Sequence, residues 1–264
     1  MDGKIAVNKG GRIGFYRQYI ANDDTKTFKK TKYKPHLNKM WCIPPKQNAE
    51  FVAHMEDILS VYSRPYNPEK PVVCMDEKPY QMLGSDYPSI EMSETNKVRK
   101  YDCEYSRKGT CSIFMFTEPL GGWREAHALP QRRATDWANQ IKWLVDDVYS
   151  NSEKIVLVMD NLNTHSIASL YKHFAPEEAF RISQKLEIHY TPKHGSWLDI
   201  AEIELSALTL QCLESRRIST IEDLNLELVK WYSDRNLNQK GVNWHFAIDD
   251  ARVKLKHLYP IIVL

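Results

Sequence analysis

Two short apolar segments that each end in an aspartate constrain this chain more than any other feature. The first reads VVCMDE over residues 72–77, and the second reads IVLVMDNLNTH over residues 155–165. A strand that is apolar on both faces lies inside a sheet, where an ionised carboxylate is costly unless it is paired or binds a cation. At the carboxyl end of such a strand, a side chain reaches the crevice where open α/β sheets bind ligands. The pattern therefore predicts a sheet that presents Asp76 and Asp160 at its carboxyl end.

Either aspartate alone would also fit a turn or a helix cap. Two carboxylates at one place repel each other, whereas a hard cation such as Mg²⁺ between them would neutralise the charge. A third acidic candidate follows in LDIAEIELSAL, residues 198–208, where Glu202 and Glu204 flank an apolar stripe on opposite sides. Periodicity does not choose between them, because either could be a surface glutamate near a helix start. We also predict Ser196 as the N-cap of this helix.

Hydrophobic periodicity and turn residues predict the order of the remaining elements. The expected elements are a helix over 48–62, a strand over 72–76, a hairpin of strands 98–107 and 111–117 that turns at Lys108-Gly109, a strand over 125–129, a helix over 134–149, a strand over 155–160, a helix over 166–174, a helix after Pro176, a strand over 186–190, and helices over 197–213, 221–232 and 248–258. Antiparallel strands followed by alternating helices and strands predict an α/β fold with one mixed sheet flanked by helices.

Composition excludes some classes of protein and leaves others open. The chain of 264 residues shows no signal-peptide pattern and no apolar run near the roughly 18 residues of a membrane helix, so we expect a soluble cytoplasmic protein. Its five cysteines are scattered without a C-x-x-C pair, which argues against disulfides and thiolate zinc sites. The net charge of +2 is weak evidence for a nucleic-acid partner. A cluster of lysines over residues 29–39 would suit either phosphate binding or a solvated surface.

Three blocks of this sequence resemble the signature blocks of DDE transposases of the mariner superfamily, in its bacterial insertion-sequence branch. The blocks are VVCMDE, VMDNLNTH and HYTPKHGSWLDIAEIE. In that superfamily the second block reads Asp-Asn, a few residues, then His, and Asp160, Asn161 and His165 match it. The third block aligns Glu202, rather than Glu204, with the catalytic glutamate. Asp76 matches the first aspartate, and the resemblance extends over most of residues 33–264.

The resemblance implies the ribonuclease H-like fold, in which three antiparallel strands precede alternating helices and strands. It implies that Asp76, Asp160 and Glu202 are the catalytic and metal-binding residues. Two Mg²⁺ ions, for which Mn²⁺ could substitute, would be bridged by Asp76 and held singly by the other two. The implied reaction is phosphodiester hydrolysis at transposon ends, followed by attack of the freed 3′-hydroxyl on target DNA.

The same resemblance implies partners and further site residues. The partners are the double-stranded DNA of transposon ends and target, with a homo-oligomer during transposition and no membrane, so we expect a nucleoid-associated protein. Asn161 and His165 are predicted neighbours of the active site, and His165 could orient a water, touch phosphate or serve as a core hydrogen-bond partner. The predicted DNA-binding residues are Lys29, Lys30, Lys32, Lys193 and His194.

We predict four regions: a basic N-terminal tail or remnant of a lost DNA-binding region over 1–40, a helical connector over 41–70, the catalytic domain over 71–235 and a C-terminal helical extension over 236–264. Family members carry helix-turn-helix modules before the catalytic domain, and only about forty residues precede Trp41. We therefore expect a truncated or split transposase. Two alternatives stay open: a simple ribonuclease H-like nuclease, and a non-catalytic remnant that oligomerises with a full-length transposase.

Overall fold

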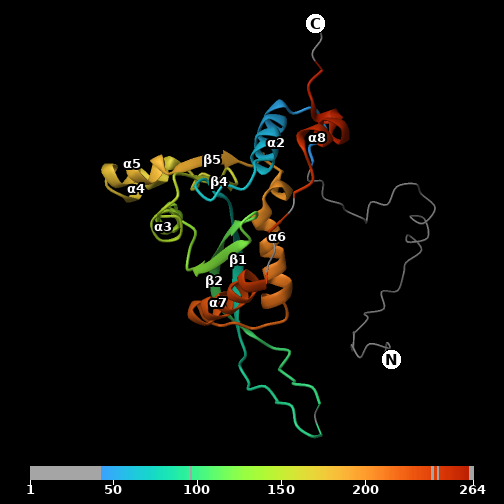
Figure 1. Ribbon diagram of the computed structural model, residues 1–264. Helices are drawn as coiled ribbons and strands as arrows, with labels where there is room; N and C mark the ends of the chain where they lie inside the picture. Colours follow the sequence, from blue (N-terminus) through green and yellow to red (C-terminus); the bar gives the residue numbers. More distant parts are fainter. Residues whose placement is uncertain (1–42, 96, 239–240, 243, 262–264) are drawn as a thin grey trace, which may run out of the picture. The chain divides into compact units, whose positions relative to one another are not determined.

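The computed structural model describes residues 43–95, 97–238, 241–242 and 244–261 (Figure 1). The chain divides between Trp41 and Cys42, and all of the described residues belong to the second part. The predicted basic tail, including Lys29, Lys30 and Lys32, lies outside the described residues.

A five-stranded mixed sheet forms the centre of the described part (Figure 1). The strands are β1 (Val72–Gly84), β2 (Ser106–Glu118), β3 (Trp123–Leu129), β4 (Ile155–Met159) and β5 (Leu186–Tyr190), in the order β3-β2-β1-β4-β5. β2 is antiparallel to both of its neighbours, β1 and β3, and β4 and β5 run parallel to β1. The described part therefore has the predicted ribonuclease H-like fold.

Helices cover both faces of this sheet. They are α2 (Ala49–Tyr62), α3 (Ala134–Trp143), α4 (Ile167–His173), α5 (Pro176–Gln184), α6 (Ile200–Leu208), α7 (Ile221–Asn238) and α8 (Ile248–Lys254). One apolar cluster joins α2, α6, α7 and α8 to one face, and a second joins α3, α4 and α5 to the other. Figure 1 shows α3 and α6 on opposite sides of β1 and β2.

Alternation along the strands explains the two clusters. Successive strand residues point to opposite faces, and in β1 Cys74 packs on the α6 side while Val73 and Met75 pack on the α3 side. All five residues of β4 are buried, as predicted for a central strand. The next residues along β1, Asp76 and Glu77, therefore start towards opposite faces of the sheet.

The predicted hairpin over residues 98–117 is wrong. β1 is much longer than the predicted 72–76, and β2 pairs with it directly in antiparallel register, from Cys74 opposite Thr117 to Gly84 opposite Ser106. The Lys108-Gly109 signal marks an irregularity inside β2, where Gly109 has a φ of +104°, instead of a turn. A register shift lies across from it in β1, and a glycine inside a strand is typical of such a bulge. Among the described residues between the two strands, the pairing is a single bridge of Ile90 with Lys100.

The other predicted elements occur with shifted ends. The helix expected over 134–149 continues from α3 into a π-helical turn over Leu144–Val148, and α7 extends beyond the predicted Tyr232 to Asn238. Pro176 opens α5 at its first position, as predicted. In the part of the chain that the structure describes, no helix combines the length and apolarity needed to span a membrane.

Candidate active site

The register between two parallel strands brings Asp76 and Asp160 together. Val72, Val73 and Cys74 of β1 lie opposite Val156, Leu157 and Val158 of β4. Two residues further along each strand direction come Asp76 and Asp160. Because neighbouring strands lie about 4.8 Å apart, the two carboxylates start from adjacent positions at the carboxyl end of the sheet.

The start of α6 places the third predicted residue, Glu202, in its first turn. The predicted N-cap is wrong: Ser196 opens a short 3₁₀ turn over Ser196–Leu198, and Asp199 caps α6 through its Oδ1, which accepts the Ala201 N–H at 2.9 Å. The Asp199 N–H donates to the Ser196 carbonyl at 2.8 Å. This bond satisfies the group that a capping-box glutamate at the third helical position would otherwise bind. The 3₁₀ turn therefore leaves the Glu202 carboxylate available to the site.

Glu202 and Glu204 have different surroundings. Glu204 is 4% exposed and forms ion pairs with Arg124 of β3 at 3.0 Å and Arg235 of α7 at 3.2 Å. Glu202 is half-buried, and its charge acts on Asp76 and Asp199. The structure thus assigns Glu204 to packing between α6, β3 and α7, and it places Glu202 where its charge acts on the strand-end carboxylate of Asp76.

Carboxylates at this end of the sheet destabilise one another's charged forms. Burial, together with the charges of Asp160, Glu202 and Glu77, raises the pKa of Asp76 to about 6, although its carboxylate accepts the Glu77 N–H at 2.7 Å. Asp199 is 2% exposed, and burial reinforced by the charge of Asp76 raises its pKa well above the usual range. Its Oδ2 is buried without a hydrogen-bond partner among the described residues. Such perturbed carboxyl groups are typical of functional sites.

His165 connects Asp160 to Glu77. Its Nδ1 lies 2.6 Å from Asp160 Oδ1, and its Nε2 lies 3.0 Å from Glu77 Oε1. Burial opposes a charged imidazole, but the two carboxylates outweigh it and raise the pKa of His165 to about 9. Burial would raise the pKa of Asp160, and the His165 hydrogen bond and charge reverse that effect and lower it. Both ring nitrogens are engaged, so the geometry favours the core hydrogen-bond role for His165 over contact with water or phosphate.

The donor chemistry of this site fits a divalent cation. All of the clustered groups offer carboxylate oxygens, which hard cations prefer, and a cation would stabilise the ionised form of Asp76, whose pKa is raised by burial and by neighbouring carboxylates. The fit concerns charge and chemistry rather than ready-made geometry: among the described residues, no three His, Cys, Asp or Glu side chains already form a metal-binding group.

A cleft of about 590 Å³ opens beside Asp160. Its lining includes Asp160, Asn161, Thr191, Lys193, His194, Ser196, and Glu50 and His54 of α2. Lys193 and His194 are exposed in the loop that follows β5, and His194 has a φ of 66°. Gly195 is required there, since a Cβ on it would lie 2.4 Å from Pro192 Cγ. The predicted DNA-binding residues of this loop therefore share one cleft with Asp160 and Asn161.

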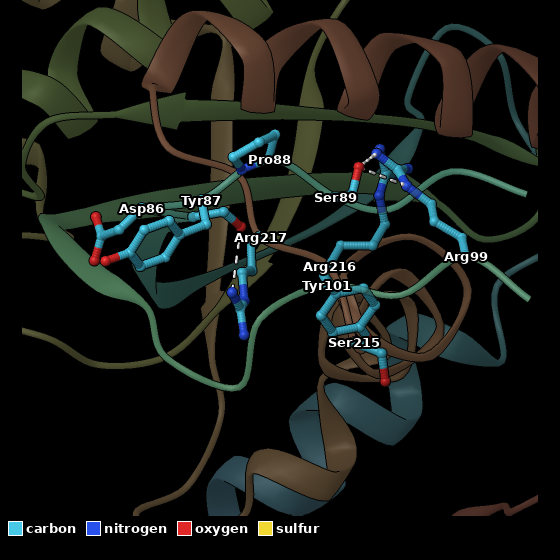
Figure 2. A pocket seen from close by; sticks show the side chains of 10 residues that line it. Asp86, Tyr87, Pro88, Ser89, Arg99, Tyr101, Ser215, Arg216 and Arg217 are labelled. Atoms are coloured by element: carbon cyan, nitrogen blue, oxygen red, sulfur yellow. Dashed lines mark hydrogen bonds between the residues drawn. The ribbon is translucent and has the colours of Figure 1, made fainter.

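A second pocket, of about 510 Å³, lies at the base of the connection between β1 and β2 (Figure 2). Its arginines already have protein partners. Arg217 donates to the carbonyls of Asp102 and Glu104 and lies over the Tyr101 ring at 5.2 Å, and Arg216 pairs with Glu227 at 2.9 Å. None of the clustered carboxylates lines this pocket, and we assign it to anchoring the connection.

Sequence reasoning missed two residues of the site. Glu77 is adjacent to Asp76. The signal available in the sequence was a second carboxylate directly after the apolar residues of this strand. Asp199 is in the third block, but a residue near a helix start gives no indication that it is fully buried. Both assignments depend on partners that are distant in the sequence.

A search against protein-family models finds one match, to the DDE superfamily endonuclease family, over residues 71–225. That match covers more than half of the chain. The chain belongs to this family. Residues 71–225 are its DDE endonuclease domain. A search of curated proteins finds no match.

Solved structures with similar folds include two of the Mos1 mariner transposase. The paired-end complex with Mn has 13% identity and a TM-score of 0.49, and the match covers 80% of this chain and 62% of that chain. The paired-end complex with Mg has 12% identity and a TM-score of 0.49, with 90% and 71% covered. The catalytic core of BIV integrase has 14% identity and a TM-score of 0.34, with 71% and 97% covered. The DDE chain thus spans 62% of the length of the first of these relatives.

Proposed function

We propose that this chain is the catalytic part of a transposase that cleaves phosphodiester bonds at transposon ends and joins the freed 3′-hydroxyl to target DNA. The observation that supports the proposal is that, within a DDE endonuclease domain, the parallel register of β1 and β4 sets Asp76 beside Asp160, and the charges of Asp160 and Glu202 both act on Asp76. These three residues are far apart in the sequence, and they come from β1, from the end of β4 and from the first turn of α6.

In this proposal Asp76, Asp160 and Glu202 would hold two Mg²⁺ ions, for which Mn²⁺ could substitute. Bound ions would stabilise the attacking and leaving oxygens of an in-line displacement at phosphorus. Asp160 contributes a carboxylate whose lowered pKa keeps it ionised at neutral pH. Lys193 and His194, on the wall of the cleft beside Asp160, are suited to contact the DNA backbone.

The partners follow from the same proposal. The DNA is double-stranded, and the chain acts as a homo-oligomer on two transposon ends. The Mos1 mariner transposase, a member of the superfamily that the sequence resembles, forms a paired-end complex.

Product chemistry tests the proposal. A labelled duplex that carries the inverted repeats flanking this reading frame is incubated with the full chain, a target plasmid and Mg²⁺ or Mn²⁺. We expect cleavage at the repeat end and a joined product in which the labelled 3′ end is covalently attached to the plasmid. Cleavage without joining would make the chain a simple nuclease. Joining only after a full-length transposase is added would make it a dependent partner.

A further inference from the structure

A hydrogen-bonded group of three side chains connects β1 to the segment after β4 directly behind the proposed metal-binding carboxylates. It consists of Glu77, His165 and Asp160, and we call it the His165 network. We propose that Glu77 is a positioning residue that acts through His165 to hold the Asp160 carboxylate in the orientation that metal binding requires. This inference rests on the proposed function, and it concerns how the metal-binding site is held in place.

The His165 network passes from one face of the sheet to its carboxyl end. Glu77 follows Asp76 in β1, so the two side chains leave the strand in opposite directions. Asp76 reaches the carboxylates near α6, whereas Glu77 reaches the side of α3 and binds His165. One dipeptide of β1 thus supplies a proposed metal ligand on one face and the support of a second proposed ligand on the other.

The imidazole ring of His165 has little freedom to move. The residue is 2% exposed, and its ring stacks on the fully buried Trp137 with centroids 6.0 Å apart and planes 27° apart. Its carbonyl accepts the Tyr190 hydroxyl at 2.8 Å, which fixes the backbone to β5. Because stacking and the backbone hold the ring in place, the hydrogen bond between Glu77 and His165 also restrains the orientation of the Asp160 carboxylate.

Within the His165 network, the two supporting side chains are buried and the proposed metal ligand is exposed. The side chains of Glu77 and His165 are 3% and 1% exposed, whereas that of Asp160 is 48% exposed and lines the cleft. The two inner groups are therefore inaccessible to DNA, and the outer one is accessible. Outer-shell partners of this kind orient the ligand and set its basicity.

Burial of the Glu77 carboxylate lowers the stability of the fold, so stability alone does not explain a glutamate at this position. Its Oε2 is buried without a hydrogen-bond partner among the described residues. A half-satisfied buried carboxylate carries a desolvation cost that a neutral side chain would avoid. A role in orienting Asp160 accounts for a carboxylate at this position.

The test measures metal affinity in the absence of DNA. Binding of Mn²⁺ to the full chain is followed by the loss of the free-ion EPR signal, for wild type, Glu77→Ala, Glu77→Gln and Asp160→Asn, with thermal unfolding recorded for each variant. We expect Glu77→Ala to bind Mn²⁺ about 10-fold more weakly. Glu77→Gln should retain most of the affinity, because its amide can either accept from or donate to His165 Nε2.

A matched control exists in a second group of the same composition. His189 lies between Asp57 at 2.7 Å and Glu187 at 3.0 Å, and none of these three residues lines the cleft beside Asp160. Glu187→Ala removes a carboxylate from a histidine in the same way as Glu77→Ala does. We expect it to leave Mn²⁺ affinity unchanged.

The possible outcomes separate the two proposals. If wild type binds Mn²⁺ and folded Glu77→Ala binds it equally well, the positioning role is wrong and the proposed function stands. If Glu77→Gln loses as much affinity as Glu77→Ala, positioning by a hydrogen bond is wrong. If wild type and Asp160→Asn bind equally, the metal site itself is wrong and both proposals fall. Should Glu77→Ala not fold, Glu77→Met, which refills the space, is measured in its place with the same expectation.

Discussion

Two histidines of this chain are each bound by two carboxylates, and their consequences differ. His165 binds Asp160 and Glu77 at 2.6 and 3.0 Å, and His189 binds Asp57 and Glu187 at 2.7 and 3.0 Å. The side chain of His165 is 1% exposed, whereas that of His189 is 12% exposed. Glu187 also pairs with Arg64 at 2.7 Å, so its charge is shared with a cation.

The difference lies in solvent and counter-charge rather than in hydrogen-bond length. Where water is excluded, each hydrogen bond to a charged group is stronger and the arrangement is held rigidly. Beside His189, the side chains of Asp57 and Glu187 are 44% and 36% exposed, so water and Arg64 compensate their charges and the geometry is held less rigidly. If His165 has the proposed positioning role, the comparison shows which property distinguishes it from His189: burial of the histidine together with its inner carboxylate.

The largest expected effect comes from neutralising the more exposed carboxylate beside each histidine, which is Asp160 for His165 and Asp57 for His189. Asp160→Asn should reduce Mg²⁺-dependent DNA cleavage by several orders of magnitude, because a proposed metal ligand loses its charge, while circular dichroism stays that of wild type. Asp57→Asn makes the same change beside His189 and should leave cleavage unchanged. Equal cleavage by wild type and Asp160→Asn would remove Asp160 from the mechanism.

The next largest effect compares two carboxylates of α6. Glu204 is paired with arginines, whereas Glu202 acts on other carboxylates. Glu204→Gln should lower the free energy of unfolding by about 3–5 kcal/mol, since Arg124 would be left buried without its counter-charge. Glu202→Gln should change stability little and abolish cleavage. Urea denaturation and a cleavage assay are carried out on both variants. Loss of cleavage in Glu204→Gln, with cleavage retained in Glu202→Gln, would overturn the assignment of Glu202.

A smaller effect concerns the pH dependence of the His165 network. The pKa of His165 is raised from 6.5 to about 9, so the folded state holds this proton more tightly than the unfolded state. The resulting stability is fully present below pH 6.5 and is lost as pH rises through about 9. The stability advantage of wild type over His165→Asn should therefore shrink by about 3–4 kcal/mol across that range, measured by urea denaturation in EDTA. An advantage that stays constant across the range would contradict a charged His165 held by Asp160 and Glu77.

The smallest effect concerns the burial of Asp76 among other carboxylates. Its pKa is raised from 3.8 to about 6, so the folded state favours the protonated carboxyl, and stability is lost as pH rises through about 6. In EDTA, Asp76→Asn should be more stable than wild type by about 3 kcal/mol at pH 7.5, with the difference vanishing below pH 4. Thermal unfolding at the two pH values provides the measurement. A variant that is less stable at pH 7.5 would show that burial and the neighbouring charges do not disfavour the ionised Asp76 carboxylate.

Most of the fold was predictable from local pattern. The apolar run of β4, the strand over 186–190 and the helix after Pro176 occur where the sequence predicts them. The false hairpin over 98–117 arose because a glycine with positive φ serves equally in a turn and in a bulge. Only pairing with β1 decides between these uses, and that pairing is not encoded by neighbouring residues.

The sequence by itself determined the strand-end aspartates and the family, because those depend on residue order over a few positions. Tertiary structure alone decided that Glu204 is neutralised by Arg124 and Arg235, that Asp199 is sealed from water, and that Glu77 reaches His165. Each of these depends on which side chains meet across the sheet and on whether water can enter. Burial and counter-charge are set by packing between distant segments, so no local pattern could reveal them.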